Sequence, residues 1–385
     1  MNLTLIAGAR PNFMKIAPII HAIQKKEQEG HNIQYRLVHT GQHYDHKMST
    51  TFFQELNIPE PDVNLGCGGG TQAEQAAAIM VAFEKELISN PADLVMVVGD
   101  VTSTMACSIV AKKLNTKVAH VEAGIRSWDL TMPEEINRMV TDALADYYFT
   151  TTKLANQNLR QIGAKEEQIF FVGNVMIDTL LANQHRFVKP AFYDQFGLME
   201  REYLVMTLHR PGNVDEEAKF KALLDEIING SQGLPIIFPV HPRTAKIIQS
   251  LYPSDSFISS VPLDTSPSQD ISPSLHLVDP MGYLEFNYLV KHSKAVITDS
   301  GGITEETTVM GIPCITLRDN TERPETVTVG TNELIGTDPS AIKPAMDKLF
   351  AGDWKKGGIP VLWDGNAAIR IVEKLNEMYG REISI

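Results

Sequence analysis

Residues 94–124, LVMVVGDVTSTMACSIVAKKLNTKVAHVEAG, decide the fold class of this chain. The run LVMVV over 94–98 is apolar at every position, which is typical of a parallel strand buried on both faces. A helical pattern follows over 103–114, and KVAHV over 117–121 has the composition of a second strand. This order of strand, helix and strand predicts one unit of a doubly wound parallel sheet.

The same alternation continues on both sides of this unit and restarts once. The predicted strands are 3–7, 33–39, 94–98, 117–121, 147–150 and 169–172 in the first half, and 204–207, 236–239, 276–278, 295–298 and 314–317 in the second. Periodicity weakens over 178–190, so we expect two α/β domains, over 1–180 and 181–365. The residues leave open which domain the last helix packs on. Residues 253–274, rich in Ser, Pro and Asp, predict a long surface loop.

Composition narrows the function classes. The net charge of −13 argues against nucleic acid or an anionic membrane surface as the partner. No apolar run approaches the roughly 20 residues of a membrane span, and the start lacks the pattern of a signal peptide. Cys67, Cys107 and Cys314 show no metal-binding spacing and fit a reducing compartment. We therefore expect a cytoplasmic protein.

Ligands of open parallel sheets bind outside the carboxyl ends of the strands. In this chain nearly every predicted strand is followed there by glycine or by a polar residue. Examples are Gly8-Ala9-Arg10, Gly99-Asp100, Glu122-Ala123-Gly124, His209-Arg210 and Asp299-Ser300. Two such edges that face each other would form an active site between the domains.

The segment DSGGITEE over 299–306 joins a predicted strand to a helix. Gly301 and Gly302 let the backbone approach a ligand, and the free N–H groups of the helix start suit a diphosphate. Glu305 or Glu306 is then placed to accept hydrogen bonds from ribose hydroxyls. An ordinary helix cap at Ser300 or Thr304 explains the same residues equally well.

A second phosphate contact is predicted at GARPNFMK over 8–15, which follows the first strand. Arg10 and Lys15 lie at a helix N-terminus, where the helix dipole disfavours positive charge unless an anion compensates. This favours phosphate or leaving-group contact over a solvated helix face. The segment is not G-x-G-x-x-G, which disfavours a dinucleotide cofactor.

Three carboxylates stand at adjacent strand ends of the first sheet. Asp100 has the position of a helix N-cap, Glu122 ends an apolar strand, and Glu134 starts a helix four residues before Arg138. Each has a structural explanation by itself: a cap, a buried strand end, and a surface ion pair between Glu134 and Arg138. Together they favour acid–base chemistry.

Two histidines end strands of the second sheet. His209 is followed by Arg210, and His241 lies two residues before Arg243. Their placement indicates a polar site. No histidine or cysteine spacing in the sequence supports zinc, so we expect no metal.

The motifs then combine into one pattern. GARPNFMKIAPI, HTGQHYD, VVGDVTSTMA, HVEAGIRSWDLTMPEEINR, FFVGNVMIDTL, TLHRPGNVD, PVHPRT, ITDSGGITEE and LRDNTERPETVTVGTN occur in order from Ala7 to about Gly336. This chain resembles the non-hydrolysing UDP-N-acetylglucosamine 2-epimerases. Nine motifs in sequence make the resemblance highly specific.

The resemblance implies two Rossmann-like domains facing a cleft, as in glycosyltransferase-B-like proteins, with 366–385 returning to the first domain. It implies reversible conversion of UDP-GlcNAc to UDP-ManNAc without a cofactor, in a homodimer that supplies polysaccharide synthesis. It implies that the catalytic residues are Lys15, Asp100, Glu122, Glu134 and His209. It implies that the substrate is bound by Arg10, Arg138, His241, Arg243, Phe286, Ser300, Gly301, Gly302, Glu306 and Arg323.

The chain also departs from the family. Several bacterial members have Arg-Gln where this chain has Gly69-Gly70, in a loop that binds a second, allosteric UDP-GlcNAc. Two alternative functions remain. One is a hydrolysing epimerase that releases UDP and ManNAc, and the other is a glycosyltransferase of the same architecture.

Overall fold

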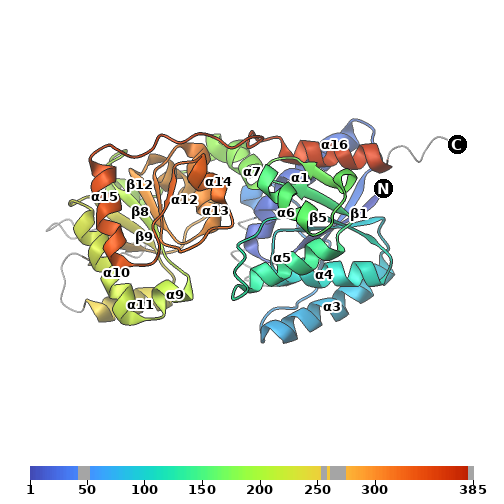
Figure 1. The fold of residues 1–385 in the computed structure, drawn as a ribbon, viewed down its shortest axis with the longest axis horizontal. Coiled ribbons are helices and arrows are strands. Elements are labelled where there is room, and N and C mark those ends of the chain that lie inside the picture. Colours follow the sequence, from blue (N-terminus) through green and yellow to red (C-terminus); the bar gives the residue numbers. More distant parts are fainter. Residues whose placement is uncertain (42–52, 253–257, 261–274, 380–385) are drawn as a thin grey trace. The chain divides into compact units, whose positions relative to one another are not determined.

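The computed structural model describes residues 1–41, 53–252, 258–260 and 275–379, and the side chains of Arg10, Pro211 and 258–260 lie outside this description. The chain divides into two compact units, one of residues 1–182 and 361–385 and one of residues 183–360. Each unit is built on a parallel sheet (Figure 1).

The first unit contains a seven-stranded parallel sheet with the strand order β3-β2-β1-β4-β5-β6-β7. Its strands are β1 (Asn2–Ala7), β2 (Gln34–His39), β3 (Val63–Asn64), β4 (Leu94–Val98), β5 (Lys117–Val121), β6 (Tyr147–Thr150) and β7 (Ile169–Phe171). Every residue of β4 is at most 1% exposed, as its continuous apolar run predicts.

Helices cover both faces of this sheet. They are α1 (Arg10–Gln28), α3 (Gln72–Ser89), α4 (Thr102–Lys113), α5 (Pro133–Leu144), α6 (Lys153–Gln161), α7 (Val175–Asn183) and α16 (Ala367–Tyr379). In Figure 1, α3, α4 and α5 lie on one face, and α1 and α16 lie on the other. α16 packs against α1, and the buried Asp178 carboxylate accepts hydrogen bonds from the N–H groups of Ala367 and Ala368 at its start.

The second unit contains a seven-stranded parallel sheet with the order β10-β11-β9-β8-β12-β13-β14. Its strands are β8 (Leu204–Thr207), β9 (Ile236–Pro239), β10 (Ile258–Ser260), β11 (Leu275–Val278), β12 (Ala295–Thr298), β13 (Cys314–Thr316) and β14 (Asn332–Leu334). Its helices are α8 (Phe192–Gln195), α9 (Pro211–Val214), α10 (Glu217–Gly230), α11 (Pro242–Leu251), α12 (Tyr283–His292), α13 (Gly301–Met310), α14 (Pro324–Thr328) and α15 (Ile342–Phe350). The expectation of two Rossmann-like parallel-sheet domains is confirmed.

One sequence expectation in this unit needs correction. The loop predicted over 253–274 contains β10, which pairs with β11 at the edge of the sheet. The rest of that stretch lies outside the described residues. No helix among the described residues is long and apolar enough to span a bilayer.

The strand orders show where ligands are expected. Successive strands are added toward one edge of the sheet and then toward the other, and this change occurs between β1 and β4 in the first unit and between β8 and β12 in the second. The loops at the carboxyl ends of such strand pairs form the ligand-binding crevice of doubly wound folds. The loops after β1, β4, β8 and β12, with the helices that follow them, carry Lys15, Asp100, His209 and 299–306, while Glu122 and His241 follow the neighbouring strands β5 and β9.

Candidate functional site

In the first unit, an ion pair joins Lys15 and Glu122, with 2.6 Å between Lys15 Nζ and Glu122 Oε2. Lys15 comes from α1 and Glu122 follows β5, and their side chains are 15% and 3% exposed. Glu122 has a φ of +69°, a left-handed conformation that is costly for a residue with a side chain. The hydrogen bond from its backbone N–H to Phe149 O, at 2.9 Å, helps to hold it there.

Asn12 fixes the loop between β1 and α1. Its Oδ1 accepts hydrogen bonds from the N–H groups of Gly8 and Ala9, and its Nδ2 donates to Val98 O at the end of β4, each at 3.0 Å. The two loops at the switch point are thereby tied together. The side chain of Arg10, the predicted phosphate contact in this loop, is outside the described part of the structure.

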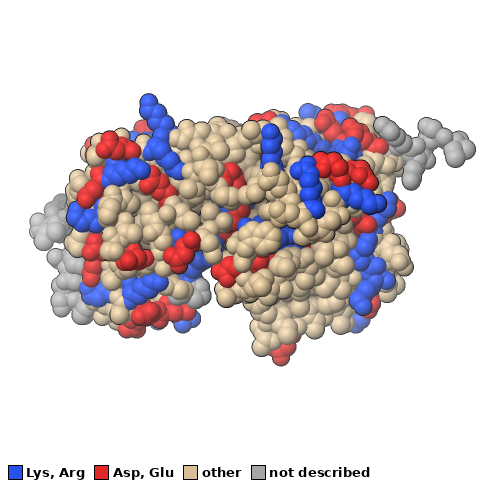
Figure 2. Space-filling model, viewed as in Figure 1, with Lys and Arg blue, Asp and Glu red and all other residues tan. Residues whose placement is uncertain are grey.

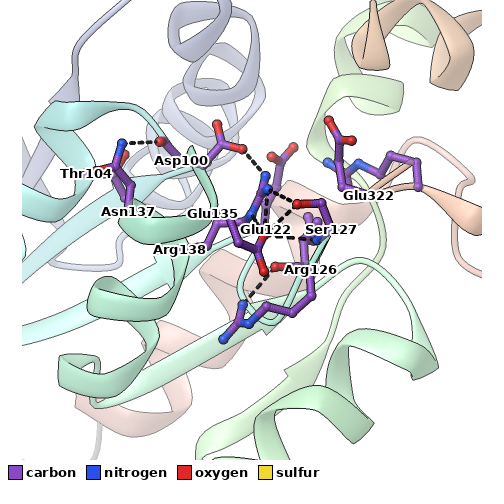
Figure 3. A network of polar contacts seen from close by, with 12 residues as sticks. Asp100, Thr104, Glu122, Arg126, Ser127, Glu135, Asn137, Arg138 and Glu322 are labelled. Carbon is purple, nitrogen blue, oxygen red and sulfur yellow. Dashed lines mark hydrogen bonds and ion pairs between the residues drawn. The ribbon is translucent and has the colours of Figure 1, made fainter. Parts of the chain in front are cut away.

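Arg138 lies between two carboxylates (Figure 3). Its Nη1 is 2.5 Å from Asp100 Oδ2, and its Nη2 is 2.7 Å from Glu135 Oε2. Arg138 is only 2% exposed, so the surface ion pair considered for Glu134 and Arg138 is wrong. Glu134 is instead exposed in the first turn of α5, beside the buried Glu135.

Glu135 positions both Arg138 and the loop before α5. Its Oε2 accepts hydrogen bonds from the N–H and hydroxyl of Ser127, and its Oε1 accepts from the N–H of Trp128. Burial raises the pKa of Glu135, but these hydrogen bonds and Arg138 outweigh burial and bring it below its usual value. Glu135 therefore stays ionised.

A fully buried network lies beneath Asp100 and Glu122. His120 Nδ1 is 2.6 Å from Asp142 Oδ1, and His120 Nε2 is 2.8 Å from Gly99 O. Asp142 Oδ2 also accepts from Gly124 N at 3.0 Å and from Arg126 Nη1 at 2.6 Å. Burial raises the pKa of Asp142, but His120 and Arg126 bring it below its usual value. The network thus holds Gly99, which directly precedes Asp100, and Gly124, which lies two residues after Glu122.

In the second unit, Asp299 and His209 form a pair across adjacent strands. Asp299 Oδ1 is 2.7 Å from His209 Nδ1, and Asp299 is fully buried while His209 is 64% exposed. Burial raises the pKa of Asp299, but the hydrogen bonds and charge of His209 bring it below its usual value.

Ser300, Gly301 and Gly302 form the start of α13. Ser300 is the N-cap residue, and within this described helix it makes no side-chain capping hydrogen bond. The simple cap explanation for Ser300 is therefore not supported. The first turn of α13 contains no acidic residue, which leaves its N–H groups compatible with an anion.

Further along α13, two buried carboxylates have different partners. Glu305 forms an ion pair with the guanidinium of Arg323, and Glu306 Oε1 accepts a hydrogen bond from Tyr283 at 2.9 Å. Burial raises the pKa of Glu306 to about 7, with the Tyr283 hydrogen bond opposing that shift and Glu305 adding to it. Arg323 and Tyr283 thus both contact α13, through Glu305 and Glu306 respectively.

The remaining predicted residues lie on neighbouring elements. His241 is the N-cap of α11, after β9, and its Nδ1 accepts a hydrogen bond from the N–H of Arg243 at 3.4 Å. Both side chains are exposed. Phe286, on α12, is half-buried and packs against the apolar cluster around Val205 and Leu289. Among the described residues, no group of three or more metal-ligating side chains gathers.

Sequence reasoning did not select Glu135, Asp142 or Tyr283 as site residues. Their roles depend on partners brought close by the fold, such as Asp142 with His120 and Tyr283 with Glu306. The sequence did point to Asp299, because it directly follows a strand, and to Glu305, as an alternative to Glu306 for the ribose contact.

The fold and these two strand-end clusters define the chain as a doubly wound α/β protein with a helix start compatible with an anion and several buried carboxylates. The model of the UDP-N-acetylglucosamine 2-epimerase family matches residues 25–376. The chain therefore belongs to the UDP-N-acetylglucosamine 2-epimerase family.

Individual relatives agree with this assignment. The UDP-N-acetylglucosamine 2-epimerase of Methanocaldococcus jannaschii is 39% identical over 389 residues, covering 99% of this chain and all of the relative. Its crystal structure in complex with UDP-GlcNAc and UDP has a TM-score of 0.84 at 37% identity, covering 98% of this chain and 100% of that one. A UDP-2,3-diacetamido-2,3-dideoxy-D-glucuronate 2-epimerase of Pseudomonas aeruginosa is 34% identical, covering 98% of this chain and 100% of the relative.

Proposed function

We propose that this chain interconverts UDP-GlcNAc and UDP-ManNAc by inverting carbon 2 of the sugar. The match of the family model over 25–376 is the observation that carries the proposal. The acid–base groups around the buried Glu122 and the half-buried Asp100, and the anion-compatible start of α13, support it.

The chemistry explains why such groups are needed. The proton on C2 is not adjacent to a carbonyl, so simple enolisation cannot remove it. In the proposed reaction a base takes this proton, its electron pair forms the C1=C2 double bond, and UDP leaves C1 with the bonding pair. UDP then returns to C1 while a proton is added to the opposite face of C2. No external cofactor is required.

We assign the proton transfers to the group of Lys15, Asp100, Glu122, Glu134 and His209. Acid–base groups of this kind typically contribute about 10²–10⁴-fold in rate. Lys15, 2.6 Å from Glu122, supplies positive charge beside the carboxylate. The variants Asp100→Asn, Glu122→Gln and Glu134→Gln identify the carboxylate that takes the C2 proton.

We assign substrate binding to residues that carry positive charge, backbone N–H groups or an aromatic face. The set is Arg10, Arg138, His241, Arg243, Phe286, Ser300, Gly301, Gly302, Glu306 and Arg323. Cationic and dipolar groups of this kind stabilise a departing diphosphate because they are oriented before its charge develops.

The experiment is product analysis in deuterated water. Incubation with UDP-GlcNAc alone should yield UDP-ManNAc, with deuterium at C2 of both UDP-sugars and only slow accumulation of UDP. Stoichiometric ManNAc and UDP would show a hydrolysing epimerase, and transfer to an added acceptor would show a glycosyltransferase. UDP-2,3-diacetamido-2,3-dideoxy-D-glucuronate, the substrate named for the Pseudomonas relative, should be assayed in parallel.

We further propose that the protein is a cytoplasmic homodimer whose product supplies polysaccharide synthesis. Cys67, Cys107 and Cys314 are free and buried thiols, which suits a reducing compartment. The surface over α3, α4 and α5 has few charged side chains (Figure 2), as expected of a face that meets a second copy.

A further inference from the structure

The buried carboxylate of Asp299, at the end of β12, gathers hydrogen bonds from the residues that follow β8. Its Oδ2 accepts from Arg210 N at 2.9 Å and from Asn213 Nδ2 at 3.1 Å, and both oxygens accept from His209 N at 3.1–3.2 Å. β8 and β12 are neighbours in register, with Thr207 opposite Thr298. Asp299 therefore ties the loop that carries His209 to the adjacent strand.

The same carboxylate determines which ring nitrogen of His209 carries a proton. An ionised carboxylate only accepts hydrogen bonds, so His209 Nδ1, 2.7 Å from Asp299 Oδ1, must be the donor. In the neutral ring the lone pair then lies on Nε2. Because His209 is 64% exposed while Asp299 is fully buried, the ring extends from its buried partner toward solvent.

We propose that Asp299 is a positioning residue that fixes the Nδ1–H tautomer of His209 and presents Nε2 as the atom that exchanges a proton with the substrate. This inference rests on the proposed function, in which His209 takes part in the chemical step. Asp299 acts through His209 and does not itself touch the substrate.

Asp299 also has a second possible role, which is to support the start of α13. Asp299 directly precedes Ser300 and Gly301, so its hydrogen bonds also stabilise the start of α13, where we place the diphosphate. A carboxylate that only supports that loop would affect UDP affinity. A carboxylate that acts through His209 would affect turnover while UDP affinity is retained.

The test is a double-mutant cycle of Asp299→Asn and His209→Gln. Asparagine keeps an oxygen for Arg210 N and Asn213 but turns an N–H toward His209 Nδ1, which moves the ring proton to Nε2. We expect kcat to fall about 10²-fold or more in each single variant, and UDP Kd from calorimetry to change less than about threefold. Adding Asp299→Asn to His209→Gln should cost almost nothing further.

Thr207→Val is the matched control. It removes the 2.7 Å contact between the hydroxyls of Thr207 and Thr298 in the same strand pair without touching the imidazole, so kcat should stay near wild type. Fully additive losses in the cycle, or a UDP Kd that rises in parallel with the loss of kcat in Asp299→Asn, would overturn the proposal in favour of loop support.

A spectroscopic measurement tests the tautomer without depending on activity. In protein labelled with ¹⁵N-histidine, the two ring nitrogens of His209 are distinguished by their ¹⁵N shifts, and His209→Gln assigns the signals. The wild type must show the Nδ1–H tautomer when the ring is neutral. An Nε2–H ring there would refute the inference even if the protein proves to be an epimerase. Near wild-type turnover in His209→Gln would refute the proton exchange at Nε2 whichever tautomer is found.

Discussion

Lys15 Nζ lies 2.6 Å from Glu122 Oε2, although the two residues belong to elements separated by the strand β4. The lysine reaches Glu122 past Gly99, the first residue after β4. A Cβ atom on Gly99 would lie 3.1 Å from Lys15 Nζ, and the φ of Gly99 is +69°. Glycine at this position therefore keeps the path of the lysine open.

Replacing Glu122 by Gln should remove the negative charge with almost no change of shape. We expect turnover to fall by roughly 10²-fold or more, because an amide cannot accept the proton that the proposed reaction transfers. Turnover should be measured with the thermal midpoint to verify folding. Glu166→Gln is the control, since Glu166 is 69% exposed in a surface pair with Arg160 and should leave turnover unchanged.

The same design applies to Asp100→Asn and Glu134→Gln. Arg138 loses a charged partner when Asp100 is neutralised, so KM should rise along with the fall in kcat. Glu134 is exposed, so its replacement should leave stability unchanged. A variant that retains near wild-type turnover identifies a carboxylate with no part in the chemistry.

Asp142→Asn should destabilise the protein strongly. His120 and Arg126 are buried around Asp142, and removing one partner of a buried ionic cluster typically costs about 3–5 kcal/mol. Urea unfolding at pH 7 measures this. Asp194→Asn removes one partner of an exposed pair with Lys189, and its effect should stay within about 1 kcal/mol. Equal effects of the two replacements would contradict the structural role of the network.

The pH dependence of this effect has a definite sign. The pKa of Asp142 is lowered in the folded state, so its contribution to stability is present above the pKa of an unfolded aspartate, about 3.9, and is lost as the pH falls through the folded value. The gap in unfolding free energy between wild type and Asp142→Asn should therefore shrink on acidification below about pH 4.

The fold could be predicted largely from local patterns because its central strands are continuous apolar runs. The strand predicted over 94–98 coincides with β4, and that over 295–298 coincides with β12. The short edge strands β3, β10 and β14 were not predicted. Each has two or three residues, so its existence depends on the neighbouring strand it pairs with and not on its own sequence.

The candidate site was only partly predictable, for a related reason. Glu122 and His209 were found because strand ends mark ligand-binding edges. Asp142 lies inside a helix, and its role depends on His120, 22 residues earlier. Glu135 stands next to Glu134 in sequence, but in helix α5 Glu135 is buried and Glu134 is exposed. The sequence alone does not show which of the two glutamates faces the interior.

Glu306→Gln should change how stability depends on pH. Burial raises the pKa of Glu306 to about 7 in the folded state, so the folded protein retains a proton that the unfolded chain releases above about pH 4.5. The stability due to this proton is complete below that pH and is lost as the pH rises through 7. Glutamine cannot titrate, so the wild type should lose up to about 3 kcal/mol relative to Glu306→Gln between pH 5 and pH 8. Urea unfolding across this range measures the difference, and parallel curves would contradict it.

The proposed dimer can be tested on α3, where Val81 and Ile88 are 55% and 61% exposed. We expect the wild type to have twice the chain mass by light scattering, and the double replacement Val81→Glu and Ile88→Glu to yield monomers, because burying two new charges opposes association. Ile162→Glu, at a residue 46% exposed after α6, is the control and should remain dimeric. A monomeric wild type would refute the dimer. A double variant that remains dimeric would show that the interface does not include this face of α3.

Regulation by a second UDP-GlcNAc should be weak or absent in this chain. An allosteric site for an anionic nucleotide-sugar needs a cation, and Gly69 and Gly70 provide only backbone N–H groups. Both have positive φ, +83° and +79°, and the Glu74 carboxylate lies 3.1 Å from where a Cβ on Gly70 would be. Hydrogen bonds from Thr71 lower the pKa of Glu74, so a negative charge in the first turn of α3 lies beside this loop and disfavours the ligand further.

Loss of an arginine contact should remove roughly 1.5–3 kcal/mol of binding free energy, about ten- to a hundredfold in affinity. Gln42, His43 and Arg210 are the residues that would form a remnant of this site, and Gln42 and His43 lie outside the described residues. The measurement starts from pure UDP-ManNAc and follows its conversion. We expect turnover without added UDP-GlcNAc, and a hyperbolic dependence on substrate in the forward direction. A strict requirement for trace UDP-GlcNAc, or clearly sigmoidal kinetics, would show that the allosteric site persists with other residues supplying the charge.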